Sequence, residues 1–168
     1  MTFVHKRWPT KQTGWHREAY NDLLTKHWKE IGSEKGGQVL VPLCGKSLDM
    51  LWFADQGYSV IGLEMVEEAI QAFFEENKLE TQSELIEGHL HHKNNPFTII
   101  EGDIFDLRAG IAKANAWYDR AAMIAIPPKM RESYVEQICR FTKPDAVGLL
   151  ITFNYPQEEM EGPPFALS

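Results

Sequence analysis

The most informative hydrophobic pattern lies in residues 38–64, where two short apolar runs flank a turn and an amphipathic stretch. The run Val39–Val41 has no polar position, which is typical of a strand buried on both faces of a parallel sheet. Pro42 has no N–H to donate to a ladder, and Gly45 can adopt backbone angles closed to other residues. The strand is therefore expected to end between Pro42 and Gly45, in a tight turn.

A helix and a second strand are predicted after this turn. Ser47 can cap the helix, and Gly57 can end it. The helix carries three apolar side chains at helical spacing, Leu48, Leu51 and Trp52. Residues 59–63 have the pattern of a second strand, and Glu64 lies at its carboxyl-terminal tip. Because open parallel sheets bind ligands beyond the carboxyl ends of their strands, this edge is the predicted site.

This edge has the chemistry for a nucleotide-like cofactor. We expect the turn to offer backbone N–H groups and a helix N-terminus to an anionic group, and Glu64 to accept hydrogen bonds from both hydroxyls of a ribose. The spacing between turn and acid is close to the roughly 20 residues of nucleotide-binding βαβ units. Gly45 stands alone where the GxGxxG motif has three glycines. That argues against NAD and favours S-adenosylmethionine, which has a ribose but no pyrophosphate. The alternative is a parallel-sheet core with a merely solvated Glu64.

The rest of the chain alternates between helical and strand patterns. Helices are predicted at 17–31, at 66–78 and from Pro127 onwards, and strands at 97–101, 118–126 and 147–153. Residues 81–92 are polar and alternate only weakly. They include His89, His91 and His92, but a strand would place His92 on the face opposite the other two, and no cysteine is near. We therefore expect no metal site.

Composition predicts one globular domain. The chain has 168 residues, of which 43% are hydrophobic and 24% charged, and its net charge is −7. This charge disfavours nucleic acid and anionic membranes as partners, because both require a basic face. No stretch has the length of a signal peptide core or of a membrane span, so a cytoplasmic location is expected. The two cysteines, Cys44 and Cys139, are not expected to form a disulfide.

Residues 39–64, VLVPLCGKSLDMLWFADQGYSVIGLE, resemble the cofactor-binding segment of the thiopurine S-methyltransferase family, in which VPLCGKS replaces the glycine-rich loop of other class I methyltransferases. Later segments agree with the family in order, namely FFEEN (73–77), GDIFDL (102–107), YDRAAMIAIPPKMR (118–131), LLITFNYP (149–156) and GPPF (162–165). The similarity covers essentially the whole chain.

The resemblance implies a fold and an activity. The fold would be α/β, with a doubly wound, mostly parallel, Rossmann-like sheet in three α/β/α layers. A single domain would span residues 1–168, with a lid segment at 1–16 and the core at 17–168. The activity would be transfer of a methyl group from S-adenosylmethionine to the sulfur of an aromatic or heterocyclic thiol, or to a selenium or tellurium species, by a monomer. The competing functions are a cofactor-binding module without turnover and, with less support, a nicotinamide-dependent oxidoreductase.

The resemblance also assigns cofactor contacts. By position in the family, these fall on Trp8, Leu43, Gly45, Glu64, Asp103, Ile104 and Arg120, with Trp15 near the acceptor. Trp8 would lie against the cofactor, although both tryptophans could instead anchor the N-terminal segment to the domain. Asp103 and Ile104 would border the adenine, although Asp103 could also cap the turn into residues 105–107.

Arg120 is the tentative catalytic residue. It follows Asp119, and charges that enter a buried strand need partners, which neighbouring loops could supply. By resemblance, Arg120 lies where cofactor and acceptor meet. Its guanidinium could hydrogen-bond an acceptor anion, or a water that takes the thiol proton.

The strand at 147–153 is expected to have an uncovered edge. It is continuously apolar, and only 15 residues follow Phe153. The resembled family continues past GPPF with a helix and two more strands, which this sequence lacks. We therefore expect a truncated chain, or a partner subunit that covers the edge, because an open apolar edge invites aggregation. Part of the family's acceptor pocket lies in the segment that is lacking here.

Overall fold

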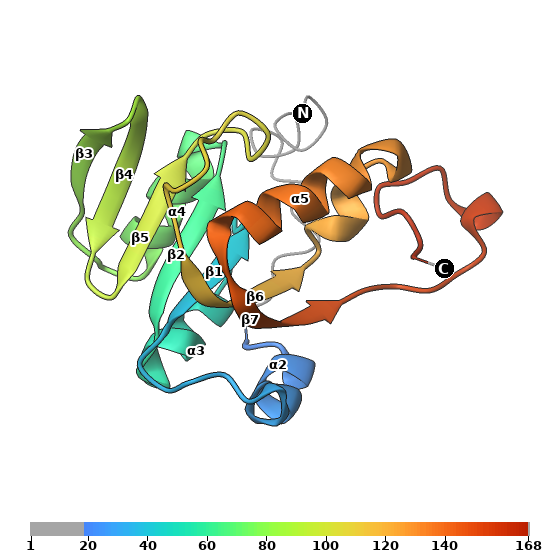
Figure 1. The fold of residues 1–168 in the computed structure, drawn as a ribbon, viewed down its shortest axis with the longest axis horizontal. Helices are drawn as coiled ribbons and strands as arrows, with labels where there is room; N and C mark the ends of the chain where they lie inside the picture. The colour runs from blue at the N-terminus through green and yellow to red at the C-terminus, as the bar shows by residue number, and fades with distance from the viewer. Residues whose placement is uncertain (1–18, 168) are drawn as a thin grey trace.

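A seven-stranded sheet organises the computed structural model, which describes residues 19–167 (Figure 1). Its order is β3-β4-β5-β2-β1-β6-β7. The strands are β1 (Gln38–Pro42), β2 (Ser59–Glu64), β3 (Gln82–Ile86), β4 (His89–Asn94), β5 (Phe97–Glu101), β6 (Ala114–Arg120) and β7 (Thr142–Ile151). The five strands from β5 to β7 in this order run parallel, and β3 and β4 pair antiparallel at the other edge. This is the mostly parallel sheet that the sequence predicts.

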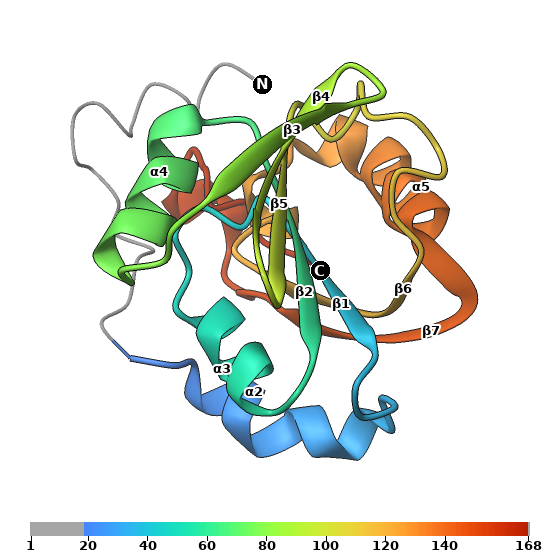
Figure 2. The same cartoon turned by 90° about the vertical axis from the view of Figure 1, so that its left-hand side faces the viewer.

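Helices cover both faces of the sheet, which confirms the three layers. They are α2 (Asp22–His27), α3 (Asp49–Asp55), α4 (Glu67–Glu76) and α5 (Arg131–Phe141), with short 3₁₀ turns η1 (Trp28–Ile31), η2 (Met123–Ala125), η3 (Pro128–Met130) and η4 (Gln157–Glu159). Figure 2 shows α3 and α4 on one side of the sheet and α5 on the other. Two separate apolar clusters match these layers, one around Phe53 and Phe73 and the other around Tyr134 and Phe141.

The predicted βαβ unit is confirmed. β1 and β2 pair in parallel from Gln38 opposite Ser59 to Pro42 opposite Leu63, and the residues of β1 after Gln38 are buried. Helix α3 lies between them and ends just before Gly57, whose φ of 87° suits a residue without a Cβ. The strand, turn, helix and strand therefore bring residues 43–47 and Glu64 to the same sheet edge.

The first predicted helix is shorter than expected. Within the described part of 17–31, residues 19–21 are not helical, and α2 begins at Asp22. The Asn21 side chain accepts hydrogen bonds from the amides of Leu23 and Leu24, at 2.9 and 3.3 Å, and so caps the helix. The apolar periodicity identified the helix but did not mark this cap.

Residues 81–92 contain a β-hairpin that the sequence pattern did not resolve. β3 and β4 join through Glu87 and Gly88, which both have positive φ, 51° and 88°. Such two-residue turns match the twist of a hairpin. β3 is the outermost strand and is almost wholly exposed, so the sequence has no hydrophobic alternation there.

The predicted strand at 118–126 is wrong in its second half. β6 ends at Arg120, and Ala121 adopts a φ of 67°. The Asp119 carboxylate accepts hydrogen bonds from the amides of Ala122 and Met123, at 3.2 and 3.0 Å, and so bends the chain out of the sheet. The apolar residues that follow are buried in a turn instead of a ladder, because burial alone does not distinguish the two.

β7 lies at the edge of the described sheet, as the sequence predicts for this strand. It begins earlier than predicted, at Thr142, and its pairing with β6 has an irregularity near Ala116. Leu150 is 39% exposed, and Phe153, after the strand, is 57% exposed. In the part of the chain that the structure describes, no helix is long and apolar enough to cross a bilayer.

Candidate functional site

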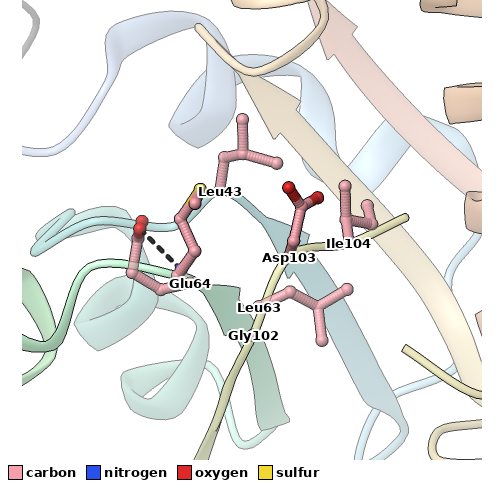
Figure 3. Close-up of a pocket in the computed structure, with 7 residues that line it drawn as sticks. Leu43, Leu63, Glu64, Gly102, Asp103 and Ile104 are labelled. Carbon is pink, nitrogen blue, oxygen red and sulfur yellow. Dashed lines mark hydrogen bonds between the residues drawn. The ribbon is translucent and has the colours of Figure 1, made fainter. Parts of the chain in front are cut away.

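A small pocket lies at the carboxyl ends of β1, β2 and β5. It is lined by Leu43, Leu63, Glu64, Met65, Gly102, Asp103 and Ile104, and encloses about 200 Å³ when the open solvent at its mouth is included. Figure 3 shows the side chains of Leu43, Asp103 and Ile104 on the same side of the strand ends. Four of these lining residues, Leu43, Glu64, Asp103 and Ile104, are predicted cofactor contacts. The pocket is thus where the sequence places the site.

Glu64 joins the ends of β1 and β2. Its Oε2 accepts from the amide of Gly45 at 2.8 Å, and its Oε1 accepts from the amides of Met65 and Val66 at 2.8 and 2.9 Å. The side chain is buried, at 4% exposure. It is therefore an ordered part of the sheet edge, which contradicts the alternative of a merely solvated acid. A carboxylate has about four acceptor positions, so amide bonds do not preclude bonds to hydroxyl groups.

The expectation that the turn offers its backbone N–H groups to an anion is wrong for three of them. The amide of Cys44 donates to the carbonyl of Leu63 at 3.0 Å, that of Gly45 to Glu64, and that of Ser47 to the carbonyl of Cys44 at 3.1 Å. A pyrophosphate cradle needs such amides directed at the ligand. This turn instead uses them to hold itself against β2.

Two residues of this turn have a left-handed backbone conformation. Leu43 has a φ of 47° and Gly45 a φ of 52°, both in the left-handed region. Gly45 adopts this region without strain, whereas a leucine there is uncommon and is held by its surroundings. The Leu43 conformation places a branched apolar side chain in the pocket wall.

Asp103 caps the turn into residues 105–107, which is the alternative to its predicted contact with the adenine. Its Oδ1 accepts from the amide of Phe105 at 3.1 Å, where the chain turns after β5. The same carboxylate lines the pocket beside Ile104, which is 2% exposed. The side chain therefore holds the turn and lines the pocket at the same time.

Arg120 lies outside this pocket and contacts the start of α3. Its Nε donates to Oδ2 of Asp49 at 2.8 Å, and its second terminal nitrogen donates to Oγ of Ser47 at 3.1 Å. Ser47 also accepts from the amide of Asp49 at 3.3 Å. The guanidinium is thus anchored beside the turn that follows β1, close to the carboxyl end of β6.

The neighbouring Asp119 has a structural role. It is 1% exposed and accepts from the Tyr134 hydroxyl at 2.7 Å as well as from the two amides of the turn. Burial raises the pKa of Asp119, against these hydrogen bonds, which lower it. Burial also raises the pKa of Tyr134, and the nearby Asp119 charge raises it further. The two charged residues therefore have partners in different parts of the chain. Arg120 bonds Ser47 and Asp49 near the start of α3, and Asp119 bonds the turn after β6 and Tyr134 on α5.

Other reactive side chains near the site are inert or structural. Cys44 is buried, and burial, with the charge of Glu64, raises the pKa of its thiol, which disfavours the nucleophilic thiolate. The two ring nitrogens of His92, on β4, hydrogen-bond the side chains of Ser83 on β3 and Glu101 on β5, each at 2.9 Å. Among the described residues, no group of three histidine, cysteine or carboxylate side chains could hold a metal ion.

Sequence reasoning missed part of the pocket. Leu63, Met65 and Gly102 line it, and none of them has a chemical signature in the sequence. The position of each next to Glu64 or Asp103 is the signal that could have found it, because a residue at a strand end shares its edge with its neighbours. Trp8 and Trp15 lie outside the described residues.

The lining fits a nucleoside better than a phosphate. Leu43 and Ile104 provide apolar surface for a flat ring, and the carboxylates of Glu64 and Asp103 accept hydrogen bonds from hydroxyl and amino groups. Two carboxylates repel a phosphate at the same place. This donor and acceptor set is compatible with the adenosine part of a cofactor that has no phosphate.

Comparisons with known proteins give a family match for the whole chain. The profile of the family described as "Thiopurine S-methyltransferase (TPMT)" matches residues 1–168. A similar relative is the thiopurine S-methyltransferase of Shewanella sp. (strain ANA-3), which is 45% identical over 167 residues. The match covers 99% of this chain and 77% of the relative.

Solved structures of methyltransferases share the fold. The 1,6-didemethyltoxoflavin-N1-methyltransferase of Burkholderia thailandensis, bound to 1,6-didemethyltoxoflavin and S-adenosylhomocysteine, superposes with a TM-score of 0.66 at 15% identity, covering 92% of this chain and 60% of that one. The glycopeptide N-methyltransferase MtfA, complexed with S-adenosylmethionine, gives a TM-score of 0.63 at 14% identity, covering 85% and 59%. At such identities the likeness shows the fold alone.

Proposed function

The chain belongs to the thiopurine S-methyltransferase family, and from this premise we propose that the pocket at the ends of β1, β2 and β5 binds the adenosine part of S-adenosylmethionine for methyl transfer to a thiol. The single observation that carries the proposal is the pairing of Glu64 with Gly45 at this edge, beside the apolar wall of Leu43 and Ile104. The enzyme is a thiopurine S-methyltransferase, and its acceptor is a small thiol.

Each pocket residue has a proposed part in binding. Glu64 accepts hydrogen bonds from the ribose hydroxyls, Asp103 accepts one from the adenine amino group, and Leu43 and Ile104 pack against the ring. Gly45 supports this arrangement by holding the Glu64 carboxylate in place. The three amides that the turn uses internally count against a pyrophosphate here, and so against the nicotinamide-dependent oxidoreductase.

The cofactor, when bound, supplies an electrophilic methyl group on a sulfonium centre. The protein orients the acceptor, excludes water and stabilises the acceptor as a thiolate. Arg120 is the proposed group for this last task, because its guanidinium is fixed beside Ser47, next to the cofactor turn. It hydrogen-bonds the thiolate directly, or a water that takes the thiol proton. No covalent intermediate on the protein is needed, in agreement with the buried, weakly acidic Cys44 thiol.

Two tryptophans complete the proposed site by family position. Trp8 is proposed to bind the sulfonium through its aromatic face, because such a face attracts cations, and Trp15 is proposed to lie near the acceptor. The chain is proposed to act as a cytoplasmic monomer on an aromatic or heterocyclic thiol. Selenium and tellurium species are further candidate acceptors.

Calorimetric titration with S-adenosylmethionine and S-adenosylhomocysteine tests the cofactor. We expect micromolar binding that Glu64→Ala weakens about tenfold or more, or about 1.4 kcal/mol. Glu101→Ala is the matched control, because Glu101 lies opposite Glu64 on β5, does not line the pocket and bonds His92 instead. Equal binding by wild type and Glu64→Ala would contradict the proposed place of the ribose. Binding without transfer to any thiol would favour the alternative of a module without turnover.

A further inference from the structure

Asp49 is a buried carboxylate that three parts of the chain share. It is the first residue of α3 and is 2% exposed. Its Oδ1 accepts from the amide of Asn21 at 2.8 Å, ahead of α2. Its Oδ2 accepts from the Tyr118 hydroxyl at 2.9 Å and from Nε of Arg120 at 2.8 Å, both on β6. The carboxylate is therefore fixed by donors other than Arg120.

The Asp49 carboxylate in turn fixes the guanidinium of Arg120. The guanidinium is planar and presents its donors in a rigid fork, so two anchors define its plane. Asp49 binds Nε, and Ser47 accepts from a terminal nitrogen at 3.1 Å. Ser47 lies in the turn that follows β1 and Asp49 begins α3 directly after it, so the two anchors set the position of Arg120 relative to that turn.

A buried ion pair is weak evidence for stability, because desolvation offsets much of its Coulomb energy. Orientation of a functional group is the better explanation here. We propose that Asp49 is a positioning residue of the methyl transfer reaction, which holds the Arg120 guanidinium in the orientation that the thiol acceptor requires. This inference rests on the proposed role of Arg120, and it adds a residue that does not itself contact the acceptor.

The substitution Asp49→Asn removes one of the two acceptor oxygens of this side chain. An amide has one acceptor oxygen, whereas Asp49 uses both of its oxygens as acceptors. The variant can accept either from the Asn21 amide or from Tyr118 and Arg120, and its bond to Arg120 loses the charge of the acceptor. Tyr134→Phe is the matched control, because it removes the hydroxyl of another buried tyrosine that bonds a carboxylate, Asp119, and leaves every bond of Asp49 in place.

Steady-state kinetics with a thiopurine acceptor, together with calorimetry of S-adenosylmethionine, test the proposal. We expect Asp49→Asn to raise the KM for the acceptor about tenfold or more, and to change the Kd of the cofactor less than about twofold. Tyr134→Phe should leave both constants within about twofold of wild type. In the Arg120→Ala background, Asp49→Asn should have no further effect on the acceptor KM. An unchanged acceptor KM in folded Asp49→Asn, or full additivity with Arg120→Ala, would overturn the proposal.

A spectroscopic measurement keeps this proposal separate from the proposed function. The Nε–H resonance of Arg120 in a ¹H–¹⁵N spectrum, assigned by its loss in Arg120→Ala, requires no cofactor or acceptor. It should shift in Asp49→Asn and remain in place in Tyr134→Phe, and an unmoved resonance in Asp49→Asn would refute the positioning role. If Asp49→Asn does not fold, Asp49→Glu replaces it in both experiments, because it keeps the charge and displaces the carboxylate by one methylene. A wild-type chain that shows the resonance and no methyl transfer would refute the function and leave the Asp49–Arg120 geometry intact.

Discussion

Single carboxylates connect separate parts of this site. Glu64, Asp103 and Asp49 each accept from backbone or side-chain donors of their surroundings, and two of them also line the pocket. A carboxylate with several donors is well suited to this task, because each oxygen accepts more than one hydrogen bond. The residues proposed to bind the cofactor therefore also hold the turns that form its pocket.

The pH dependence of stability can be predicted for His91. Burial lowers its pKa below the ordinary 6.5, and Lys93 and His89 lower it further, against smaller effects of Glu84 and Glu87. The unfolded chain therefore binds a proton at a higher pH than the folded protein does. The stabilisation is present above about pH 6.5 and is lost as the pH falls through the lower, folded-state pKa.

Urea unfolding at about pH 7.5 and about pH 5.5 measures this effect. The loss of unfolding free energy on acidification should be smaller in His91→Gln than in wild type. His27→Gln is the control, because His27 lies at the end of α2, is only partly buried and bonds Glu30. A wild-type loss that persists unchanged in His91→Gln would show that other groups cause it.

At the scale of elements, the turn after β6 depends on one side chain. The Asp119 carboxylate accepts hydrogen bonds from the amides of Ala122 and Met123 and from the hydroxyl of Tyr134. These bonds connect the end of β6 to the turn that follows it and to α5. We expect Asp119→Ala to cost about 3 kcal/mol in unfolding free energy, because buried donors lose their acceptor. Tyr134→Phe removes one donor only and should cost about 1 kcal/mol. Chemical denaturation measures both, and equal costs would contradict the dominance of the carboxylate.

The same elements show what the sequence can predict. The βαβ unit was predicted nearly to its residue bounds, because a fully apolar run, a proline, a glycine and a helical period agree there. The hairpin of β3 and β4 is not predicted by the sequence pattern, because the exposed strand β3 has no clear hydrophobic period. The pattern of residues 121–126 predicts a strand that does not form, because an apolar run is buried in a ladder and in a turn alike. The bond from Asp49 to Arg120 spans 71 residues, and no local pattern contains it.

At the scale of the whole molecule, β7 leaves one edge of the described sheet open. Its last five residues, Val147–Ile151, carry no charge, and Leu150 is 39% exposed. Unpaired apolar edges pair with other chains. We expect the protein to associate at high concentration through this edge, and Leu150→Lys to reduce the association as measured by light scattering.

Val135→Lys is the control for this effect, because Val135 is a similarly exposed apolar residue, at 46%, that belongs to α5 and not to β7. It makes the same change in net charge. Equal suppression of association by both substitutions would indicate a general effect of charge and would rule out the β7 edge as the cause.

We propose that this chain transfers a methyl group from S-adenosylmethionine to a thiol at the pocket beside Glu64. The most direct test is incubation with methyl-labelled S-adenosylmethionine and a thiopurine, with the label followed into the product by mass spectrometry. We expect an S-methylated thiopurine from the wild type, and a strongly reduced yield from Glu64→Ala at limiting cofactor but not from Glu101→Ala. A folded wild type that binds the cofactor and labels no thiol, or a Glu64→Ala variant as active as the wild type at limiting cofactor, would contradict it.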